Sequence, residues 1–322
     1  MPDNTNFLFN FGACCEFRRI KLKRELKISP SKKSVRKALS NAFQMLFLVL
    51  IAIFFALALR IFFLASFKIP SPSMEPAIMP GDFILVNKLI PGPRVYKNFD
   101  FTKGAKVETR RFKGIRKIKR NDVLVFNFPR HREGGGIDIA LNVNYVKRCI
   151  AVPGDSFYIE NGIYKVKGSS EVLGHLPHQQ SLSRMERERF QPEIWNTFPF
   201  DTTHYDWNVK DFGPVYIPGA GDILEIDTLN YRLYRSLISY ETDKPLVEKD
   251  GAVYLGDSLL SNYTFRQNYY FMSGDWVSDS QDSRYWGLLP EDHIIGKAIV
   301  VWKSKDMHSG KYNWKRFFKI IK

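Results

Sequence analysis

The sequence predicts a mostly β protein, in which one N-terminal transmembrane helix is followed by an antiparallel β-sheet domain with an inserted, variable subdomain. Three observations lead to this prediction. Residues 42–66 form the one apolar run long enough to cross a bilayer. After this run, short β-rich segments alternate with turn residues, as where Pro80-Gly81-Asp82 leads into a strand. Between residues 164 and 250 this alternation is lost, which indicates an insertion.

The apolar run is expected to be a retained membrane anchor rather than a cleaved signal peptide. It is longer than the apolar core of a signal peptide and lies far from the N-terminus. The preceding tail, residues 1–41, is basic, with ten Lys or Arg between Arg18 and Lys37. Because basic residues favour the cytoplasmic side, we expect this tail in the cytoplasm and residues 68–322 on the opposite side. Arg60 lies near the far end of the run, where its side chain can snorkel, so it receives no functional role.

The net charge of +15 is compatible with nucleic-acid binding, but no nucleic-acid-binding module accompanies either basic cluster. The second cluster places nine Lys or Arg between Lys103 and Arg120. It belongs to a stretch, residues 91–120, that we expect to be a mobile hairpin or a plain solvated loop, with binding of anionic lipid headgroups as the alternative. We therefore expect no nucleic-acid partner.

The cysteines and histidines predict no metal site. Cys14 and Cys15 are adjacent on the basic side of the anchor and Cys149 is alone beyond it, which predicts neither a disulfide framework nor a zinc site. The histidines of the insertion, at positions 175, 178 and 204, show no metal-ligand spacing and are expected on the surface. We expect neither a metal nor a cofactor.

The outer domain is expected to comprise residues 67–163 and 251–306, separated by the inserted subdomain at residues 164–250. After it, residues 307–322 form a basic aromatic tail that either lies on a membrane surface or is frayed and soluble. The expected strands are residues 82–89, 121–128, 144–152, 269–273 and 296–302.

Two serines, Ser71 and Ser73, stand among Pro70, Pro72 and Pro76 directly after the apolar run. Each proline fixes its own φ and pushes the preceding residue toward an extended conformation, so both hydroxyls are expected on a rigid, non-helical segment. Such a segment suits a nucleophile. The alternative is that the prolines only end a transmembrane helix and that the serines are solvated turn residues.

Lys147 lies in an expected strand, on the same face as Tyr145 and Cys149 if side chains alternate. Those neighbours are of types that are usually buried, so the lysine either snorkels to solvent or is desolvated for a purpose. A later loop, residues 274–287, is rich in hydroxyls and carboxylates and can hydrogen-bond itself into a fixed shape, with Asp282 and Arg284 as its natural ion pair.

Taken in order, four blocks of the chain resemble those of bacterial type I signal peptidases. They are residues 71–76 (SPSMEP), 81–88 (GDFILVNK), 147–155 (with KR at its start and PGD at its end) and 274–287 (with GD at its start and SQDSRYWG at its end). The resemblance covers the anchor and both parts of the outer domain, about half of the chain. The sequence departs from the family pattern at Pro72, where glycine is usual, and at Trp276-Val277, where Asn-Arg is usual.

The resemblance implies a Ser/Lys-dyad serine endopeptidase that cleaves N-terminal signal peptides from exported pre-proteins. Ser73 would attack, and Lys147 would act as general base and then as general acid, provided that desolvation lowers its pKa. The Ser73 amide and the Ser71 hydroxyl would form the oxyanion hole. Ser280 would orient the lysine amine, while the Asp282–Arg284 pair holds the loop.

The resemblance also implies substrate pockets, partners and a location. Shallow pockets would accept small residues one and three places before the scissile bond, and their lining matches Phe67, Ile69, Ile78, Tyr145 and Val146. The partners would be the signal peptides of secreted and membrane pre-proteins, together with the lipid bilayer. The protein would cross the cytoplasmic (inner) membrane once, with a cytoplasmic N-terminus and its catalytic domain on the outer, periplasmic side.

Two other functions fit parts of the sequence. A self-cleaving, repressor-type protease also uses a Ser/Lys pair on a β fold, but such proteins are soluble and carry a DNA-binding module. A membrane-tethered binding or assembly protein that has kept this fold without catalysis is suggested by Pro72 and Trp276, although both expected catalytic side chains are present.

Overall fold

The computed structural model describes residues 32–97, 107, 109–131 and 136–322. The chain divides into two compact units, which end and begin at Phe54 and Phe55, and each is considered by itself. Most of the predicted basic tail, and part of the predicted loop at residues 91–120, lie outside the described residues.

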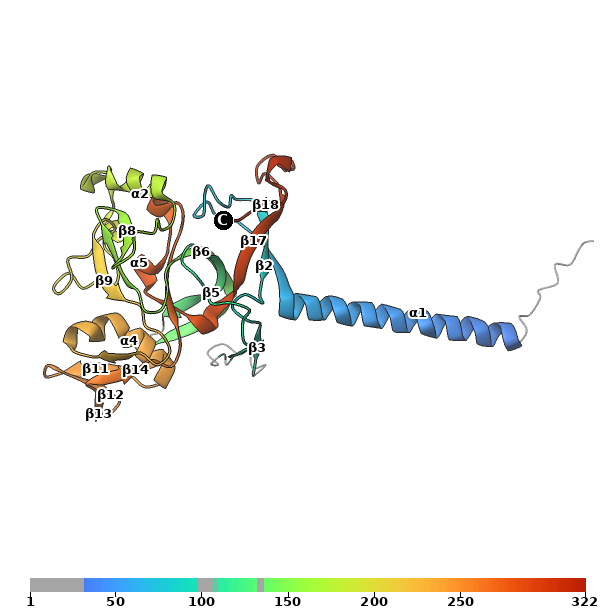
Figure 1. Ribbon diagram of the computed structural model, residues 1–322, viewed down its shortest axis with the longest axis horizontal. Coiled ribbons are helices and arrows are strands. Elements are labelled where there is room, and N and C mark those ends of the chain that lie inside the picture. Colours follow the sequence, from blue (N-terminus) through green and yellow to red (C-terminus); the bar gives the residue numbers. More distant parts are fainter. Residues whose placement is uncertain (1–31, 98–106, 108, 132–135) are drawn as a thin grey trace, which may run out of the picture. The chain divides into compact units, whose positions relative to one another are not determined.

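The membrane-length helix α1 runs from Lys32 to Ala58 and continues as a π-helical turn, Leu59–Phe63 (Figure 1). The part Leu39–Phe63 of this continuous helix is long and apolar enough to cross a membrane, and its most apolar stretch is not buried within the protein. The predicted bounds of 42–66 are wrong at both ends. Lysine and arginine are good helix formers, so the basic residues before the apolar run extend the helix.

At the other end, residues 64–66 belong to strand β1, Leu64–Lys68, because they pair with β2, Asp82–Asn87. The carbonyls left open at the end of the π turn are partly satisfied by Lys88, whose Nζ donates to the Arg60 and Ile61 carbonyls at 2.9 and 3.2 Å.

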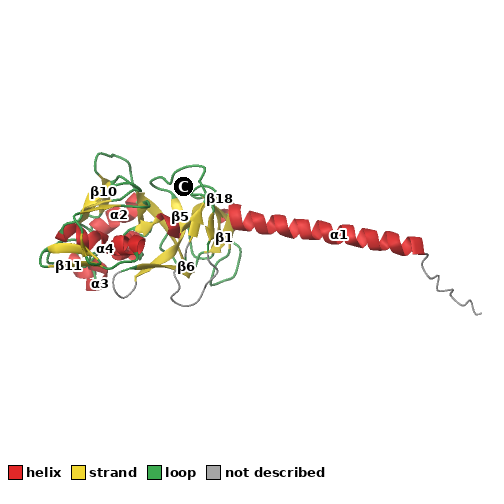
Figure 2. Ribbon diagram, turned by 90° about the horizontal axis from the view of Figure 1, so that it is seen from below, coloured by secondary structure: helices red, strands yellow, loops and turns green. Residues whose placement is uncertain are grey.

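The catalytic part predicted from sequence is built on an eight-stranded antiparallel sheet in the order β1-β2-β17-β5-β6-β15-β16, with β18 added to β17 (Figures 1 and 2). The mostly β fold class is therefore confirmed. The bounds of its remaining strands are β5 Val123–His131, β6 Ile137–Ala151, β15 Tyr269–Ser273, β16 Leu289–Pro290, β17 Ile294–Ser304 and β18 Lys319–Ile320.

Smaller sheets and helices complete the second unit. The sheets are β8-β7-β9 (Ile163–Val166, Ser156–Glu160, Phe212–Tyr216), β11-β12-β13 (Leu246–Lys249, Ala252–Leu255, Ser258–Leu259), β10-β14 (Ile223–Glu225, Asn262–Thr264) and β3-β4 (Arg94–Tyr96, Thr109–Arg111). The helices are α2 Leu176–Ser183, α3 Pro192–Trp195, α4 Thr228–Thr242 and α5 Ser283–Trp286, with 3₁₀ turns that include η3 Val277–Asp279 and η5 Trp314–Arg316.

The predicted bounds of the insertion, residues 164–250, stay a prediction. Three of the small sheets join strands across those bounds, since β8 and β9 pair with β7, β10 pairs with β14, and β11 pairs with β12. The segment also shares a core with the main sheet, where the ring centroids of Phe212 and Phe271 lie 5.6 Å apart. This packing anchors β15, the strand that leads into the loop at residues 274–287.

The C-terminal segment is docked on the main sheet, so the expectation of a frayed tail is wrong. Strand β18 pairs with β17, and Ile321 is buried. The Arg316 guanidinium also donates to the Asp82 carboxylate at 2.6 Å, and both side chains are buried. Because a buried carboxylate requires a partner, this ion pair ties the end of the chain to the start of β2. The structure does not test the alternative, that the segment lies on a membrane.

Candidate active site

The serine-bearing segment leaves β1 and is fixed to the sheet by its apolar residues. Ile69 and Met74 are buried in the core beneath β1, β2 and β17. The Ile69 amide donates to the Asp82 carbonyl at 2.8 Å, and the Glu75 amide closes a turn onto the Pro72 carbonyl at 2.8 Å. The segment is therefore held and non-helical, as the prolines predict.

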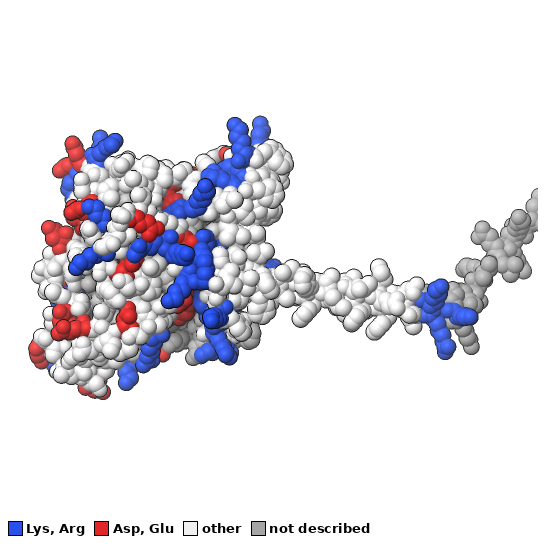
Figure 3. Space-filling model, viewed as in Figure 1, with Lys and Arg blue, Asp and Glu red and all other residues white. Residues whose placement is uncertain are grey.

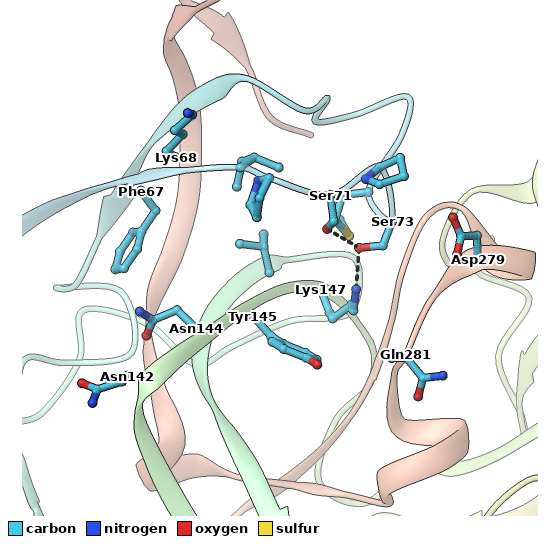
Figure 4. A pocket seen from close by; sticks show the side chains of 15 residues that line it. Phe67, Lys68, Ser71, Ser73, Asn142, Asn144, Tyr145, Lys147, Asp279 and Gln281 are labelled. Atoms are coloured by element: carbon cyan, nitrogen blue, oxygen red, sulfur yellow. Dashed lines mark hydrogen bonds between the residues drawn. The ribbon is translucent and has the colours of Figure 1, made fainter. Parts of the chain in front are cut away.

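Ser73 and Lys147 meet although they are 74 residues apart in the sequence (Figure 4). The Lys147 Nζ lies 2.6 Å from the Ser73 Oγ, within hydrogen-bonding distance. Lys147 is only 4% exposed, and Ser73 is 9% exposed. The amine also lies 5.6 Å from the centroid of the Tyr145 ring, which confirms that Tyr145 and Lys147 share a face of β6.

The environment of Lys147 favours its neutral form. Burial lowers the pKa of this lysine from 10.5 to about 8. The nearby carboxylates of Asp282, Asp279 and Asp275 raise the pKa and so oppose this effect, while the Arg284 guanidinium adds to it. Because desolvation dominates, about one tenth of the amine is unprotonated at pH 7, far more than for an ordinary lysine. A snorkelling lysine would have its amine in water, so the structure corresponds to the desolvated alternative.

Ser71 and the Ser73 amide lie beside the Ser73 hydroxyl. The two serine Oγ atoms are 3.5 Å apart, and Ser71 is exposed to the cleft. The Ser73 carbonyl accepts a hydrogen bond from the Trp276 amide at 3.1 Å, whereas the Ser73 amide donates to no group of the described residues. Pro72 has no N–H. This leaves one backbone donor and one hydroxyl next to the Ser73 Oγ.

The loop after β15 is fixed by the predicted ion pair. Asp282 and Arg284 are both fully buried, and the guanidinium contacts the carboxylate through Nε and one terminal nitrogen, each at 2.8 Å. Burial alone would raise the pKa of Asp282, but the charge of Arg284 and its hydrogen bonds outweigh this and lower it. The Gly274 amide also donates to Asp282 at 3.1 Å, so the carboxylate joins the two ends of the loop.

Ser280 is buried in this loop, but its hydroxyl has no hydrogen-bond partner among the described residues. A contact with the Lys147 amine, which the resemblance implies, is not present. A Cβ added to Gly274 would lie 2.3 Å from the Ser280 Oγ and 2.5 Å from the Ser73 carbonyl oxygen. The loop therefore packs directly against the serine segment, which requires glycine at this position.

One histidine of the insertion, His178, contacts the loop, which the sequence did not indicate. The His178 Nδ1 lies 2.8 Å from the Asp275 carbonyl, and its ring lies beside that of Trp276 with centroids 6.0 Å apart. His175 and His178 are half-buried, so the expected surface location holds only for His204. The Asp275 carboxylate forms a bidentate pair with Arg148, at 2.6 Å for both contacts, and Arg148 follows Lys147 in β6.

A cleft of about 560 Å³ opens in front of Ser73 and Lys147 (Figure 4). Four of the five residues expected to line substrate pockets do line it, namely Phe67, Ile69, Tyr145 and Val146. The fifth expectation differs from the structure: Ile78 is wholly buried in the core, because its amide closes a turn onto the Met74 carbonyl and directs the chain inward. The cleft is also lined by polar side chains that sequence reasoning missed: Lys68, Asn142, Asn144, Asp279 and Gln281.

Asn142 and Asn144 could have been found from the alternation of β6. They stand four and two residues before Val146, which is expected to line a substrate pocket, so alternation predicts them on the same face of the strand as that residue. Asp279 and Gln281 lie in an irregular loop, for which the sequence offers no periodic signal. Among the described residues, no group of three or more His, Cys, Asp and Glu side chains is arranged to hold a metal ion.

Comparison with known proteins gives a consistent family. A family model described as "Signal peptidase, peptidase S26" matches residues 42–303. Signal peptidase I of Buchnera aphidicola subsp. Acyrthosiphon pisum is 29% identical over 282 residues, which cover 83% of this chain and 78% of that protein. Signal peptidase I of Aquifex aeolicus is 25% identical, covering 80% of this chain and 82% of the relative. Signal peptidase I of Haemophilus influenzae is 26% identical, and the match covers 92% of this chain and 80% of that protein.

Proposed function

The chain belongs to the signal peptidase family, peptidase S26, and on this premise we propose that Ser73 and Lys147 form its catalytic dyad. The protein is then a membrane-anchored serine endopeptidase that removes N-terminal signal peptides from exported pre-proteins. The observation that carries the proposal is the 2.6 Å contact between the Ser73 hydroxyl and the Lys147 amine, both of them buried.

The mechanism follows from the environment of the two groups. A serine hydroxyl is a weak nucleophile unless a base takes its proton, and a lysine with a pKa of about 8 can accept it. Ser73 Oγ attacks the scissile carbonyl while its proton passes to the neutral Lys147 amine. The resulting ammonium then gives the proton to the leaving amine. This amine is the N-terminus of the mature protein, which is released at this stage. Water then repeats both steps on the acyl-enzyme and releases the signal peptide.

The charge that develops on the carbonyl oxygen requires donors that are already in place. The Ser73 amide and the Ser71 hydroxyl are the nearest groups that can serve, since the amide is not used within the described residues and the hydroxyl lies 3.5 Å from the Ser73 Oγ. Pro72 between them restricts the backbone, so the departure from the family's usual glycine stiffens this turn.

The cleft supports a peptide substrate with small side chains. Its walls are the apolar side chains of Phe67, Ile69 and Val146, and the Tyr145 ring lies at its base (Figure 4). A channel between two strands can hold an extended peptide, and shallow apolar walls favour small residues near the scissile bond. We propose that the residues one and three places before that bond occupy these walls.

The location follows from the anchor and its charge. The helix is apolar over Leu39–Phe63, and the residues on its N-terminal side are basic. By the positive-inside rule, the N-terminus is cytoplasmic and residues 68–322 lie on the outer side of the inner membrane. Protease added to the outer face of spheroplasts then digests the catalytic domain and spares the N-terminal tail. Protection of the large domain would contradict this orientation.

The test of the dyad is Lys147→Arg, assayed as purified protein in detergent with a pre-protein substrate. Arginine keeps the charge and most of the bulk but does not deprotonate, so this variant is expected to be as inactive as Lys147→Ala and Ser73→Ala. Because the two groups act as a unit, the double alanine variant should be no slower than either single variant. Substantial processing by Lys147→Arg would show that the base is elsewhere.

The same assay separates the rival functions. A binding or assembly protein without catalysis would leave the pre-protein intact with the unmodified chain, and a self-cleaving protease would process only itself. Cleavage of the pre-protein in trans distinguishes the proposed activity from both.

A further inference from the structure

A second cavity lies on the outer face of β1, β2 and β17, beside the candidate active site. It has a volume of about 300 Å³, and three lysines contribute to its lining: Lys68, Lys303 and Lys305. The strand register places the first two on either side of Phe83, which pairs with Lys68 and with Lys303. We call it the basic cavity. The rest of its lining is Phe83, Asp306, Met307, Gly310 and Tyr312.

The positive charge of the basic cavity is not neutralised by the described part of the chain. None of its three lysines forms an ion pair with a described carboxylate. Its single acid, Asp306, closes its own turn, because Oδ1 accepts from the His308 amide and from the amide and hydroxyl of Ser309. Residues 297–322 contain eight Lys or Arg and one acid, and only two of these cations, Lys297 and Arg316, form ion pairs with described carboxylates elsewhere in the chain. Such a surface attracts an anion.

The charge is also unevenly distributed over the second unit. On the face shown in Figure 3, acidic side chains gather over the part formed by α2, β9, α4 and β11, whereas basic side chains gather toward β2, β3 and β17. The basic cavity therefore belongs to the positive side of this unit.

Aromatic rings hold one of the ammonium groups in place. Lys303 Nζ lies 5.0, 5.9 and 5.5 Å from the ring centroids of Phe83, Trp302 and Tyr312. Cation–π contacts orient an ammonium without using its N–H donors. The Trp302 indole is itself fixed, since its Nε1 donates to the Ser66 hydroxyl at 2.8 Å. Lys303 is thus a preorganised donor for an incoming oxyanion.

The surroundings of the basic cavity resemble a membrane–water interface. Exposed apolar and aromatic side chains lie in the strand and the C-terminal segment that form it: Trp302, Met307, Trp314, Phe318 and Ile320. Phe63 ends the candidate membrane span, and Lys68 follows five residues later at the end of β1. At about 3.3 Å per residue, a strand of that length reaches no more than roughly 17 Å. Lys68 is therefore confined to the neighbourhood of the bilayer surface, where aromatic and basic side chains are enriched.

We propose that the basic cavity binds the phosphate group of an anionic membrane phospholipid, with Lys68, Lys303 and Lys305 as its donors. Lysine is a common phosphate ligand, and basic side chains near an anionic leaflet gain affinity from its negative potential. The exposed apolar side chains favour a lipid over a free phosphate, because they offer contacts to the acyl-chain region that a soluble anion cannot use. The bound lipid would hold the face of β1, β2 and β17 against the membrane.

The test measures lipid binding by native mass spectrometry of the full chain in a nonionic detergent. Equal amounts of phosphatidylglycerol and phosphatidylcholine with the same acyl chains are added, and the excess of phosphatidylglycerol adducts is recorded. Each lysine near an anionic surface contributes about fivefold in affinity, so Lys303→Gln with Lys305→Gln should weaken phosphatidylglycerol binding roughly 25-fold. The matched control, Lys244→Gln with Lys249→Gln, removes two exposed charges elsewhere and should retain the excess.

The double variant Lys303→Arg with Lys305→Arg preserves both charges and controls for loss of binding through misfolding. It should keep most of the excess of phosphatidylglycerol adducts. A photoreactive headgroup analogue of phosphatidylglycerol should label peptides from residues 64–85 and 302–312. The proposal would be overturned if the glutamine pair kept the full excess of phosphatidylglycerol adducts or if the arginine pair lost it. Labelling confined to other peptides would also overturn it. Equal binding of both lipids by the unmodified chain would overturn it as well.

Discussion

In the proposed dyad, the pKa of Lys147 controls how much of the enzyme is competent at a given pH. At a pKa of about 8, roughly one tenth of the amine is neutral at pH 7, against about 0.03% at the ordinary value of 10.5. Burial thus raises the competent fraction by roughly 300-fold, equivalent to about 3 kcal/mol. We therefore expect kcat/KM to rise about tenfold per pH unit at low pH and to level off near pH 8.

The perturbation that tests this reasoning is Asp279→Asn. Asp279 is exposed at the cleft, and its carboxylate raises the pKa of Lys147. Its removal should lower that pKa and move the acidic limb of kcat/KM to lower pH. The displacement should shrink as salt is added, because salt screens an exposed charge. Asp257→Asn, which removes an exposed carboxylate from the turn between β12 and β13, is the matched control and should leave the limb unchanged.

The assay is the cleavage of an internally quenched signal-peptide substrate by the full chain in nonionic detergent, followed from about pH 6 to 10.5. An acidic limb centred near 10 in the unmodified enzyme would refute the desolvation of Lys147. A limb that stays in place or moves to higher pH in Asp279→Asn would refute the electrostatic account.

Three further outcomes are expected. Ser71→Ala should fold normally and lose roughly 10²- to 10³-fold in kcat with little change in KM, since its hydroxyl acts on developing charge; a loss below about fivefold would remove it from the site. Arg316→Ala leaves the buried Asp82 carboxylate without its ion-pair partner and should lower the free energy of unfolding, measured in urea, by about 3–5 kcal/mol. A decrease of less than about 1 kcal/mol, typical of an exposed ion pair, would contradict this. Lys147→Met should raise the free energy of unfolding of the inactive protein by about 2 kcal/mol at pH 7. Removing the buried charge contributes a gain of about 3 kcal/mol, and losing the hydrogen bond to Ser73 takes away about 1 kcal/mol. Because the pKa of Lys147 is lower in the folded state, that gain should decline between pH 8 and 10.5 and turn into a loss of about 1 kcal/mol above, where only the lost hydrogen bond remains; a gain independent of pH would contradict it.

The sequence predicts those parts of the site that local patterns determine. Alternation in one strand is enough to place Lys147 beside Tyr145, and proline sterics are enough to hold the Ser73 segment. Asp282 and Arg284 stand two positions apart in a polar loop, so their ion pair is also a local feature. What brings these pieces to one place is the order of strands in the sheet, which the resemblance supplies and periodicity does not.

Contacts between distant residues account for most of what was missed. Arg316 and Asp82 are 234 residues apart, and nothing in the composition of a basic aromatic tail indicates that one arginine is buried against the first turn of the sheet. The inward position of Ile78 likewise depends on a turn formed with Met74 rather than on alternation. The end of the membrane helix was misplaced for a similar reason: residues 64–66 are apolar enough for a bilayer, but pairing with β2 assigns them to the sheet.

The loop after β15 explains why Ser73, the proposed nucleophile, stays in position although the chain around it is irregular. The Trp276 amide donates to the Ser73 carbonyl, and Gly274 leaves no room for a side chain between that carbonyl and Ser280. This close approach depends on the shape of the loop, which two buried ion pairs fix at different points: Arg148 with Asp275, and Arg284 with Asp282. Arg148 directly follows Lys147, so the strand that carries the proposed base also holds the loop that supports the proposed nucleophile. The distance between Lys147 and Ser73 is therefore set by one continuous set of contacts, in which a change at Asp275 should disturb catalysis without touching either side chain of the proposed dyad.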